Sequence, residues 1–160
     1  MLKKYLMIFF ISMVPVVELR GAIPFSQVLE LPLIPSYIIA IIGNMLPVPL
    51  IYLFARRVLE WMSRQSSIIG RIGQFFLQKG ERGGQKLLEK AGKGGTFFAL
   101  LLFVGIPLPG TGAWTGTLAA SILKMDFKRS IIACMLGVVL AGFIMSCGSQ
   151  IVVTIIHLFS

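Results

Sequence analysis

The chain has 160 residues, the size of one domain. Hydrophobic residues make up 56% of it and charged residues 13%, whereas a soluble domain carries about 25% charged residues. So few charges cannot cover a surface in water, and the mean hydropathy is +0.89. Composition therefore excludes an ordinary soluble enzyme and predicts a single membrane domain over residues 1–160.

The net charge of +9 comes from 15 Lys and Arg residues against 6 Asp and Glu residues. Such a balance can indicate nucleic-acid binding. Here, however, the basic residues lie between hydrophobic blocks, as the positive-inside rule describes for cytoplasmic loops. We expect a multi-pass protein of the cytoplasmic (inner) membrane with residues 56–93 on the cytoplasmic side. The lipid bilayer is its expected partner, and nucleic acid is not.

A short hydrophobic block opens the chain and a long one follows. Tyr5–Val17 holds 13 residues, too few to span about 30 Å of hydrocarbon as a straight helix. Leu31–Ala55 holds 25 residues without a charge and predicts a transmembrane helix. Asn44 and Pro47 add a polar group and a kink to this helix.

The basic segment 56–93 contains apolar residues at helical spacing. They predict an amphipathic helix that lies along a headgroup surface; these residues are Ile68, Ile69, Ile72, Phe75 and Phe76. Glycines punctuate the second part of the segment. We therefore expect only one further short helix there, around Gln85–Ala91.

Two further hydrophobic blocks complete the chain. Gly94–Leu123 has no charge, but two prolines and four glycines interrupt it between Gly105 and Gly116. Such a stretch cannot form one unbroken helix. Ser130–Ser160 is uncharged and continuous, and it predicts the clearest transmembrane helix.

The order of the blocks suggests an inverted repeat of residues 1–55 and 94–160. Each half then has a broken block that is re-entrant, the first from outside and the second from the cytoplasm, followed by a long transmembrane helix. A weak match between residues 38–40 and 131–133, each shortly before a glycine, favours this arrangement. If both broken blocks cross fully, the chain has four spans with both ends inside. The predicted fold is all-α in either case.

Glu18 and Arg20 are the most informative polar residues. Ionisable side chains at membrane depth are costly, so they usually face a bundle interior or a water cavity and mark a pathway. Gly21 and Pro24 follow them, and a proline interrupts helical hydrogen bonding. We expect Glu18 to bind a proton or a cationic substrate, with Arg20 as its partner or an anion contact. The alternative is that both side chains snorkel to headgroups.

The second broken block supplies the other candidate site. Its threonines, Trp114 and bare backbone carbonyls can line a cavity opposite the Glu18 loop, and a helix that starts near Gly112 directs its positive end at an anionic group. The alternative is a kinked helix that packs through Gly112 and Gly116. The expected pathway residues are Glu18, Arg20, Gly21, Pro24, Asn44, Pro107, Pro109, Gly110, Thr111, Gly112, Trp114 and Thr115.

We expect no enzyme activity, no cofactor and no metal site. The sequence has no P-loop, zinc motif or nucleophile elbow. Cys134 and Cys147 point about 220° apart on one helix and His157 is the only histidine, so the ligands for a metal are missing. Ala133, Gly137 and Ala141 form a stripe of small residues that is typical of helix packing.

The two loops, in this order, resemble the bacterial and archaeal small multidrug export family, and the resemblance extends over nearly the whole chain. They are Val17–Pro24, which reads VELRGAIP, and Gly105–Gly116, which reads GIPLPGTGAWTG. The resemblance implies drug efflux. Gly116–Phe127 is also distantly similar to the DedA superfamily, which has paired re-entrant loops and includes carriers of lipid-linked phosphates. The arginine that DedA proteins often carry in the second loop is absent, with Thr111 and Gly112 in its place.

Three functions are consistent with these features. The first is a small transporter, an exporter of drugs or other small molecules, in which Glu18 couples transport to protons. The second is a DedA-like flippase for a lipid-linked or anionic phosphate carrier, in which Arg20 matters more. The third is a membrane assembly or scaffold protein without transport. Because four hydrophobic blocks can hardly enclose a pathway, we expect a homodimer or another homo-oligomer in each case.

Overall fold

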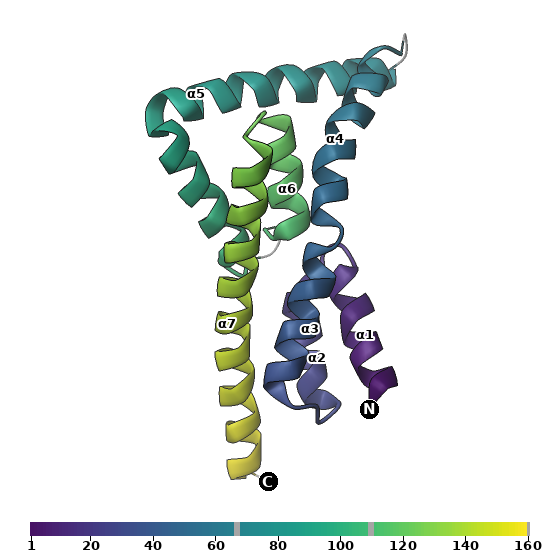
Figure 1. Ribbon diagram of the computed structural model, residues 1–160, viewed down its shortest axis with the longest axis vertical. Coiled ribbons are helices and arrows are strands. Elements are labelled where there is room, and N and C mark those ends of the chain that lie inside the picture. Colours follow the sequence, from purple (N-terminus) through teal and green to yellow (C-terminus); the bar gives the residue numbers. More distant parts are fainter. Residues whose placement is uncertain (66–67, 109–110, 160) are drawn as a thin grey trace.

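The computed structural model is helical, and Figure 1 shows its arrangement. It describes the backbone of residues 1–65, 68–108 and 111–159, and the side chains of these residues except 76, 79–88, 90–91, 93 and 152–159. No strand occurs in this part of the chain. The helices are α1 (Leu2–Met13), α2 (Glu18–Val28), α3 (Leu33–Met45), α4 (Val48–Ser63), α5 (Ile68–Gly105), α6 (Ala113–Ile122) and α7 (Phe127–Phe159).

The first broken block is a helical hairpin. Its two arms, α1 and α2, have 12 and 11 residues, so each rises only about 16–18 Å, well short of a bilayer core. The non-helical part is the turn Val14–Val17, whereas the sequence around Pro24 stays helical. The N-terminus and the end of α2 lie at the same end of the molecule, and the turn lies partway along α7 (Figure 1).

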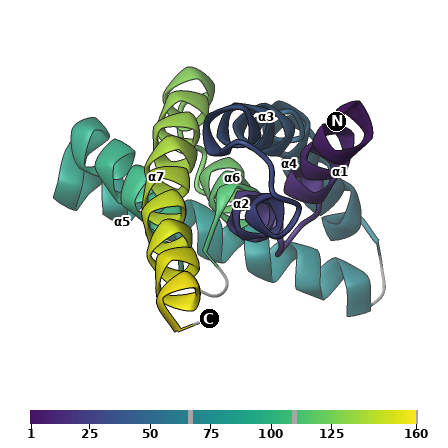
Figure 2. The same cartoon turned by 90° about the horizontal axis from the view of Figure 1, so that it is seen from below.

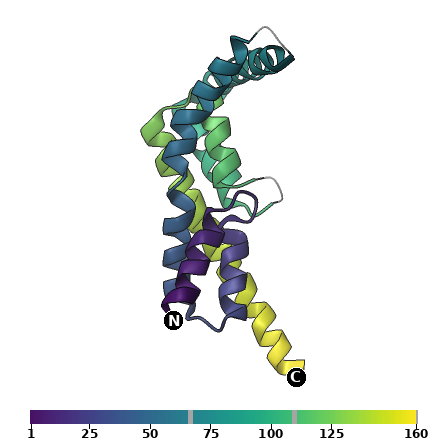
Figure 3. The same ribbon diagram turned by 90° about the vertical axis from the view of Figure 1, so that its right-hand side faces the viewer.

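The second broken block forms a similar hairpin from the other end. Its first arm is the last part of α5, after a kink at Gly92 (φ 63°, ψ −177°), and its second arm is α6, with 10 residues. The loop between the arms faces the turn of the first hairpin, as Figures 1 and 3 show. The two hairpins therefore meet tip to tip between the longer helices.

Two stretches are long and apolar enough to cross a membrane. They are Leu33–Ser63, which comprises α3 and α4, and Phe127–Ile151 within α7. The predicted kink in the first of them is confirmed, because α3 ends at Met45 and α4 begins at Val48, on either side of Pro47. Together with the composition, these helices support a membrane protein.

The basic segment is more helical than expected. Arg56–Ser63 continues α4, and α5 runs without interruption from Ile68 to Gly92 across the end of the bundle (Figure 1), so there is no separate helix at Gln85–Ala91. A glycine inside a helix costs about 1 kcal/mol, but it does not force a break. The helix bends only at Gly92, where φ is positive.

Glycines let the long helices approach each hairpin closely. A Cβ atom at Gly43 of α3 would lie 2.5 Å from the carbonyl oxygen of Phe9 in α1. A Cβ atom at Gly137 of α7 would lie 2.8 Å from the carbonyl oxygen of Leu101 in α5. Ala133 and Ala141, on the same face as Gly137, are buried, which confirms that this stripe is a packing surface.

Candidate functional site

The side chain of Glu18 caps the N-terminus of α6. Its two carboxylate oxygens accept hydrogen bonds from the amides of Ala113 (3.1 Å) and Trp114 (3.0 Å). Glu18 is 4% exposed. The first amides of a helix have no partner within it and carry partial positive charge, which a carboxylate satisfies. The helix expected to start near Gly112 thus starts at Ala113, and the anion at its positive end is a side chain of the protein itself.

Gly112 is the residue that lets the carboxylate reach these amides. A Cβ atom there would lie 2.8 Å from the carboxylate carbon of Glu18, and the φ of 141° also favours glycine. On the other side of the contact, Val16 (φ 75°) and Glu18 (φ 50°) both have positive φ. Non-glycine residues rarely adopt this conformation, and it is found where a site requires strain. Both loops therefore depart from regular backbone where they meet.

Arg20 holds the loop of the second hairpin. Its guanidinium donates to the carbonyl oxygens of Leu108 (2.5 Å), Val104 (3.3 Å) and Ile106 (3.3 Å) and to Oγ1 of Thr111 (2.9 Å). The planar, five-donor guanidinium suits such a set of acceptors. Within the described residues no ion pair joins Arg20 to Glu18. Arg20 thus binds the backbone of the loop rather than a carboxylate.

An apolar groove of about 430 Å³ opens between α4 and α6, next to this contact. Trp114 links the two features, because its amide binds Glu18 while its indole lines the groove. The indole Nε1 is buried without a hydrogen-bond partner. The groove is lined by Ile51, Phe54, Ala55, Val58, Leu59, Trp114, Leu118 and Ile122.

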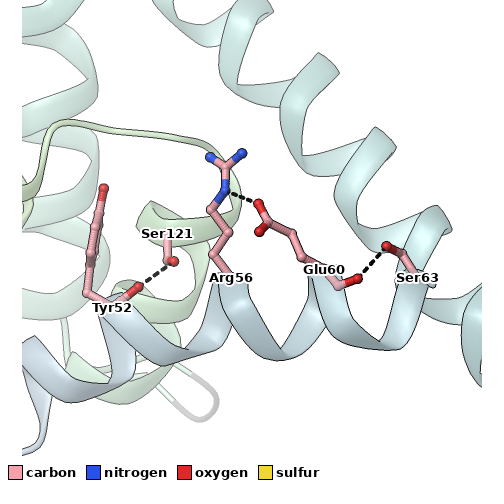
Figure 4. Close-up of polar contacts among 5 residues, drawn as sticks. All are labelled: Tyr52, Arg56, Glu60, Ser63 and Ser121. Atoms are coloured by element: carbon pink, nitrogen blue, oxygen red, sulfur yellow. Dashed lines mark hydrogen bonds and ion pairs between the residues drawn. The ribbon is translucent and has the colours of Figure 1, made fainter. Parts of the chain in front are cut away.

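Polar contacts lie beside the groove, on the two helices, α4 and α6, that form its walls. Ser121 of α6 donates to the carbonyl oxygen of Tyr52 in α4 (2.7 Å), as Figure 4 shows. The Tyr52 hydroxyl in turn donates to the carbonyl oxygen of Met125. One turn further along α4, Nε of Arg56 contacts Glu60 at 2.7 Å (Figure 4). The contacts of Ser121 and Tyr52 tie α4 to α6 and to the residues just after it, and so set the width of the groove, whereas the Arg56–Glu60 contact lies within α4.

The other predicted pathway residues have different positions. Gly21 and Pro24 lie on α2 and are partly exposed, and Thr115 is exposed on α6, where its hydroxyl contacts the Gly112 carbonyl at 3.4 Å. Pro107 is partly exposed in the loop that Arg20 binds, and Pro109 and Gly110 lie outside the described residues. Asn44 is buried in α3 with Oδ1 unpaired, and no hydrogen bond joins it to Glu18 or Arg20.

The residues of α4 that line the groove were not predicted from the sequence. Its residues read as ordinary apolar positions of a transmembrane helix, and nothing in their spacing indicates that α6 lies beside them. The only signal was Trp114, a large aromatic residue at the start of a short helix. Among the described residues, no three His, Cys, Asp or Glu side chains come together to hold a metal ion.

A family model described as "Putative small multi-drug export protein" matches residues 18–144. The match begins at Glu18 and includes Arg20, Gly112, Trp114, the first long apolar stretch and the second as far as residue 144. No curated protein and no solved structure matches the chain. Because the family model covers well over half of the chain, this protein belongs to the small multi-drug export family.

Proposed function

We propose that this protein exports amphiphilic small molecules across the cytoplasmic membrane, with the apolar part of the substrate in the α4–α6 groove. The observation that supports this is the double role of Trp114, whose amide binds Glu18 and whose indole lines the groove. A substrate in the groove therefore touches the residue that Glu18 holds. Occupation of the groove and the protonation state of the carboxylate are coupled through one residue, Trp114.

The groove has the properties of a small-molecule site. Its volume falls in the range of about 300–1,000 Å³ that is typical of ligand pockets, and such pockets combine apolar walls with a few polar groups. Phe54 and Trp114 offer aromatic surfaces, and the lining of the groove is almost wholly apolar. These walls suit a flat, apolar molecule, and nearby Glu18 favours a cationic one.

Glu18 is the proposed proton site. As a carboxylate it accepts two amide hydrogen bonds at the positive end of α6. Protonation removes the charge that the helix end stabilises and one of the acceptors, so the tip of α6 is released. Trp114 then moves with α6 and changes the groove. This gives a physical link between proton uptake and substrate release.

In the proposed topology the two hairpins are re-entrant and enter from opposite sides of the membrane, with α5 and its basic residues in the cytoplasm. An inverted repeat is supported by three pairs of residues, each separated by 94 positions. Glu30 and Lys124 each lie two residues after the end of α2 and α6, with similar positive φ (57° and 54°). Ser36 and Ser130 each donate to the carbonyl oxygen four residues before them, at 2.9 and 2.8 Å.

The third pair is Gly43 and Gly137, which bring the two long helices against the first arm of their hairpins. The two halves thus correspond at three places: after the second arm of the hairpin, at the start of the long helix, and where the long helix packs most closely against the first arm. In transporters with inverted repeats, the substrate site lies where the two repeats meet near the middle of the membrane. The contact of Glu18 and Arg20 with the second loop occupies that position in the proposed topology.

The test is transport by the purified protein in liposomes with an imposed pH gradient and a fluorescent lipophilic cation such as ethidium. We expect Glu18→Gln to abolish transport driven by the pH gradient, while Glu30→Gln, an exposed acid at the other end of α2, leaves it unchanged. We expect Trp114→Ala to raise KM about tenfold through loss of aromatic contacts, with the exposed Trp61→Ala as its control.

Equal pH-driven transport by Glu18→Gln and the unaltered protein would exclude Glu18 from coupling. No transport of the cation by the unaltered protein, together with rapid scrambling of labelled anionic lipids, would favour the flippase. We prefer export because the donors of Arg20 that a phosphate requires bind loop carbonyls. A protein that moves neither cation nor lipid would support the scaffold function.

A further inference from the structure

A row of polar side chains lies between α2 and α7, on the side of the hairpin contact away from the basic segment. In this polar row, Arg20 and Gln27 belong to α2 and share one face, since they are seven residues apart. Ser146, Ser149 and Gln150 belong to α7. Figure 2 shows α2 beside α7 when the molecule is seen from the end where both termini lie.

Contacts join the two helices along this row. Gln150 donates through Nε2 to Oε1 of Gln27 at 3.2 Å. Gly142, one turn before Ser146, packs against Tyr37 of α3 and against α2, because a Cβ atom there would also lie 3.2 Å from Leu19. Ser146 and Gln27 are only partly buried. The row is therefore an edge of the α2–α7 contact and remains partly open.

One side chain of the row lacks a hydrogen-bond partner in the part of the chain that the structure describes. The hydroxyl of Ser146 is buried and has no hydrogen-bond partner. Pro24, between Arg20 and Gln27 on α2, has no amide hydrogen to donate to the Arg20 carbonyl. Ser146 and Gln150 lie 13 and 9 residues before the end of α7 at Phe159, well within its length. An unpaired hydroxyl such as that of Ser146 needs water or another polar partner at membrane depth.

We propose that water enters the protein along the polar row and reaches Arg20 and the hairpin tips from the side of the membrane that holds the termini. The row is the aqueous half of the pathway, and the apolar α4–α6 groove on the other side of the tips is the dry half. Water suits the row because it is small enough for the Ser146 site and can donate and accept at once. This inference concerns access of water, so it holds for an exporter and for a flippase alike.

Cysteine accessibility tests the proposal directly. Gln27→Cys, Ser146→Cys and Gln150→Cys are made in a Cys147→Ala background, where the remaining Cys134 is buried. A membrane-impermeant, cationic methanethiosulfonate is added to the side of the termini. Only a thiolate reacts, and it forms in water but not in lipid. We expect the three row cysteines to react about tenfold faster or more than lipid-facing controls on α7.

Phe143→Cys and Ile151→Cys on α7 are the controls, since these apolar side chains are 64% and 60% exposed in the helical bundle. Ser146→Cys replaces one atom, so it tests the row even if Gln27→Cys fails to fold. Reaction of the row cysteines at the rate of the controls would overturn the proposal. Protection from the reagent together with disulfide-linked dimers would also overturn it, because a second copy would then cover the row.

Discussion

Glu18 and Arg20 carry out two different tasks although they are two residues apart. Glu18 binds the amides that begin α6, and Arg20 binds the carbonyls of the loop before it. Together they satisfy donors and acceptors that the broken helix of the second hairpin leaves free. The loop between Gly105 and Ala113 can therefore lie inside a membrane protein, where unpaired backbone groups cost several kcal/mol each.

We predict that the substitution Arg20→Lys lowers the stability of the protein. A lysine has three donors on one nitrogen and cannot match the acceptors from Val104 to Thr111 as the guanidinium does. The expected loss is about 2 kcal/mol of unfolding free energy, the value of one or two hydrogen bonds to a charged group. Thermal unfolding in detergent measures it. The exposed Arg57→Lys serves as control, and equal melting temperatures for both variants would contradict the role of Arg20.

Helix packing in each half depends on a glycine in the long helix. Gly43 lies against α1 and Gly137 lies against α5, both at backbone distance. Close approach of backbones is a common way to pack helices in lipid, because small residues allow extensive van der Waals contact. The long helix of each half thereby holds the first arm of its own hairpin.

We predict that alanine has opposite effects on the free energy of unfolding at two glycines of α7. Gly137→Ala places a Cβ atom 2.7 Å from Val104, so helix α5 must shift, at a cost of about 1–3 kcal/mol. Gly148→Ala meets nothing within 4 Å and gains up to about 1 kcal/mol in helix propensity. Unfolding by denaturant in mixed micelles compares the two. A Gly137→Ala variant as stable as the unaltered protein would contradict this packing.

Across the whole molecule, two hairpins too short to cross a bilayer meet between two long apolar helices (Figure 3). The N-terminus lies at one end, and residues 68–92 of α5 cross the other (Figure 1). If the hairpins are re-entrant, these two regions lie on opposite sides of the membrane. If every hydrophobic block crosses, they lie on the same side.

We therefore predict that Leu2 and Glu89, both exposed, lie on opposite sides of the membrane. In intact cells, an impermeant maleimide should label Leu2→Cys at once and Glu89→Cys only after permeabilisation, in a background without the native cysteines. Labelling of both positions only after permeabilisation would indicate four full spans and would exclude re-entrant hairpins.

The membrane class and the two broken blocks can be predicted from the sequence, which also singles out Glu18 and Arg20, because hydrophobic length, intramembrane charge and backbone-breaking residues are local features. It also indicated a repeat, although the match at residues 38–40 is one position out of the register that Gly43 and Gly137 share. The groups that Glu18 and Arg20 bind, and the place of Trp114 beside α4, become known only from the folded chain. Those contacts join residues far apart in the chain, and no local pattern of hydrophobicity, charge or glycine records which atoms meet.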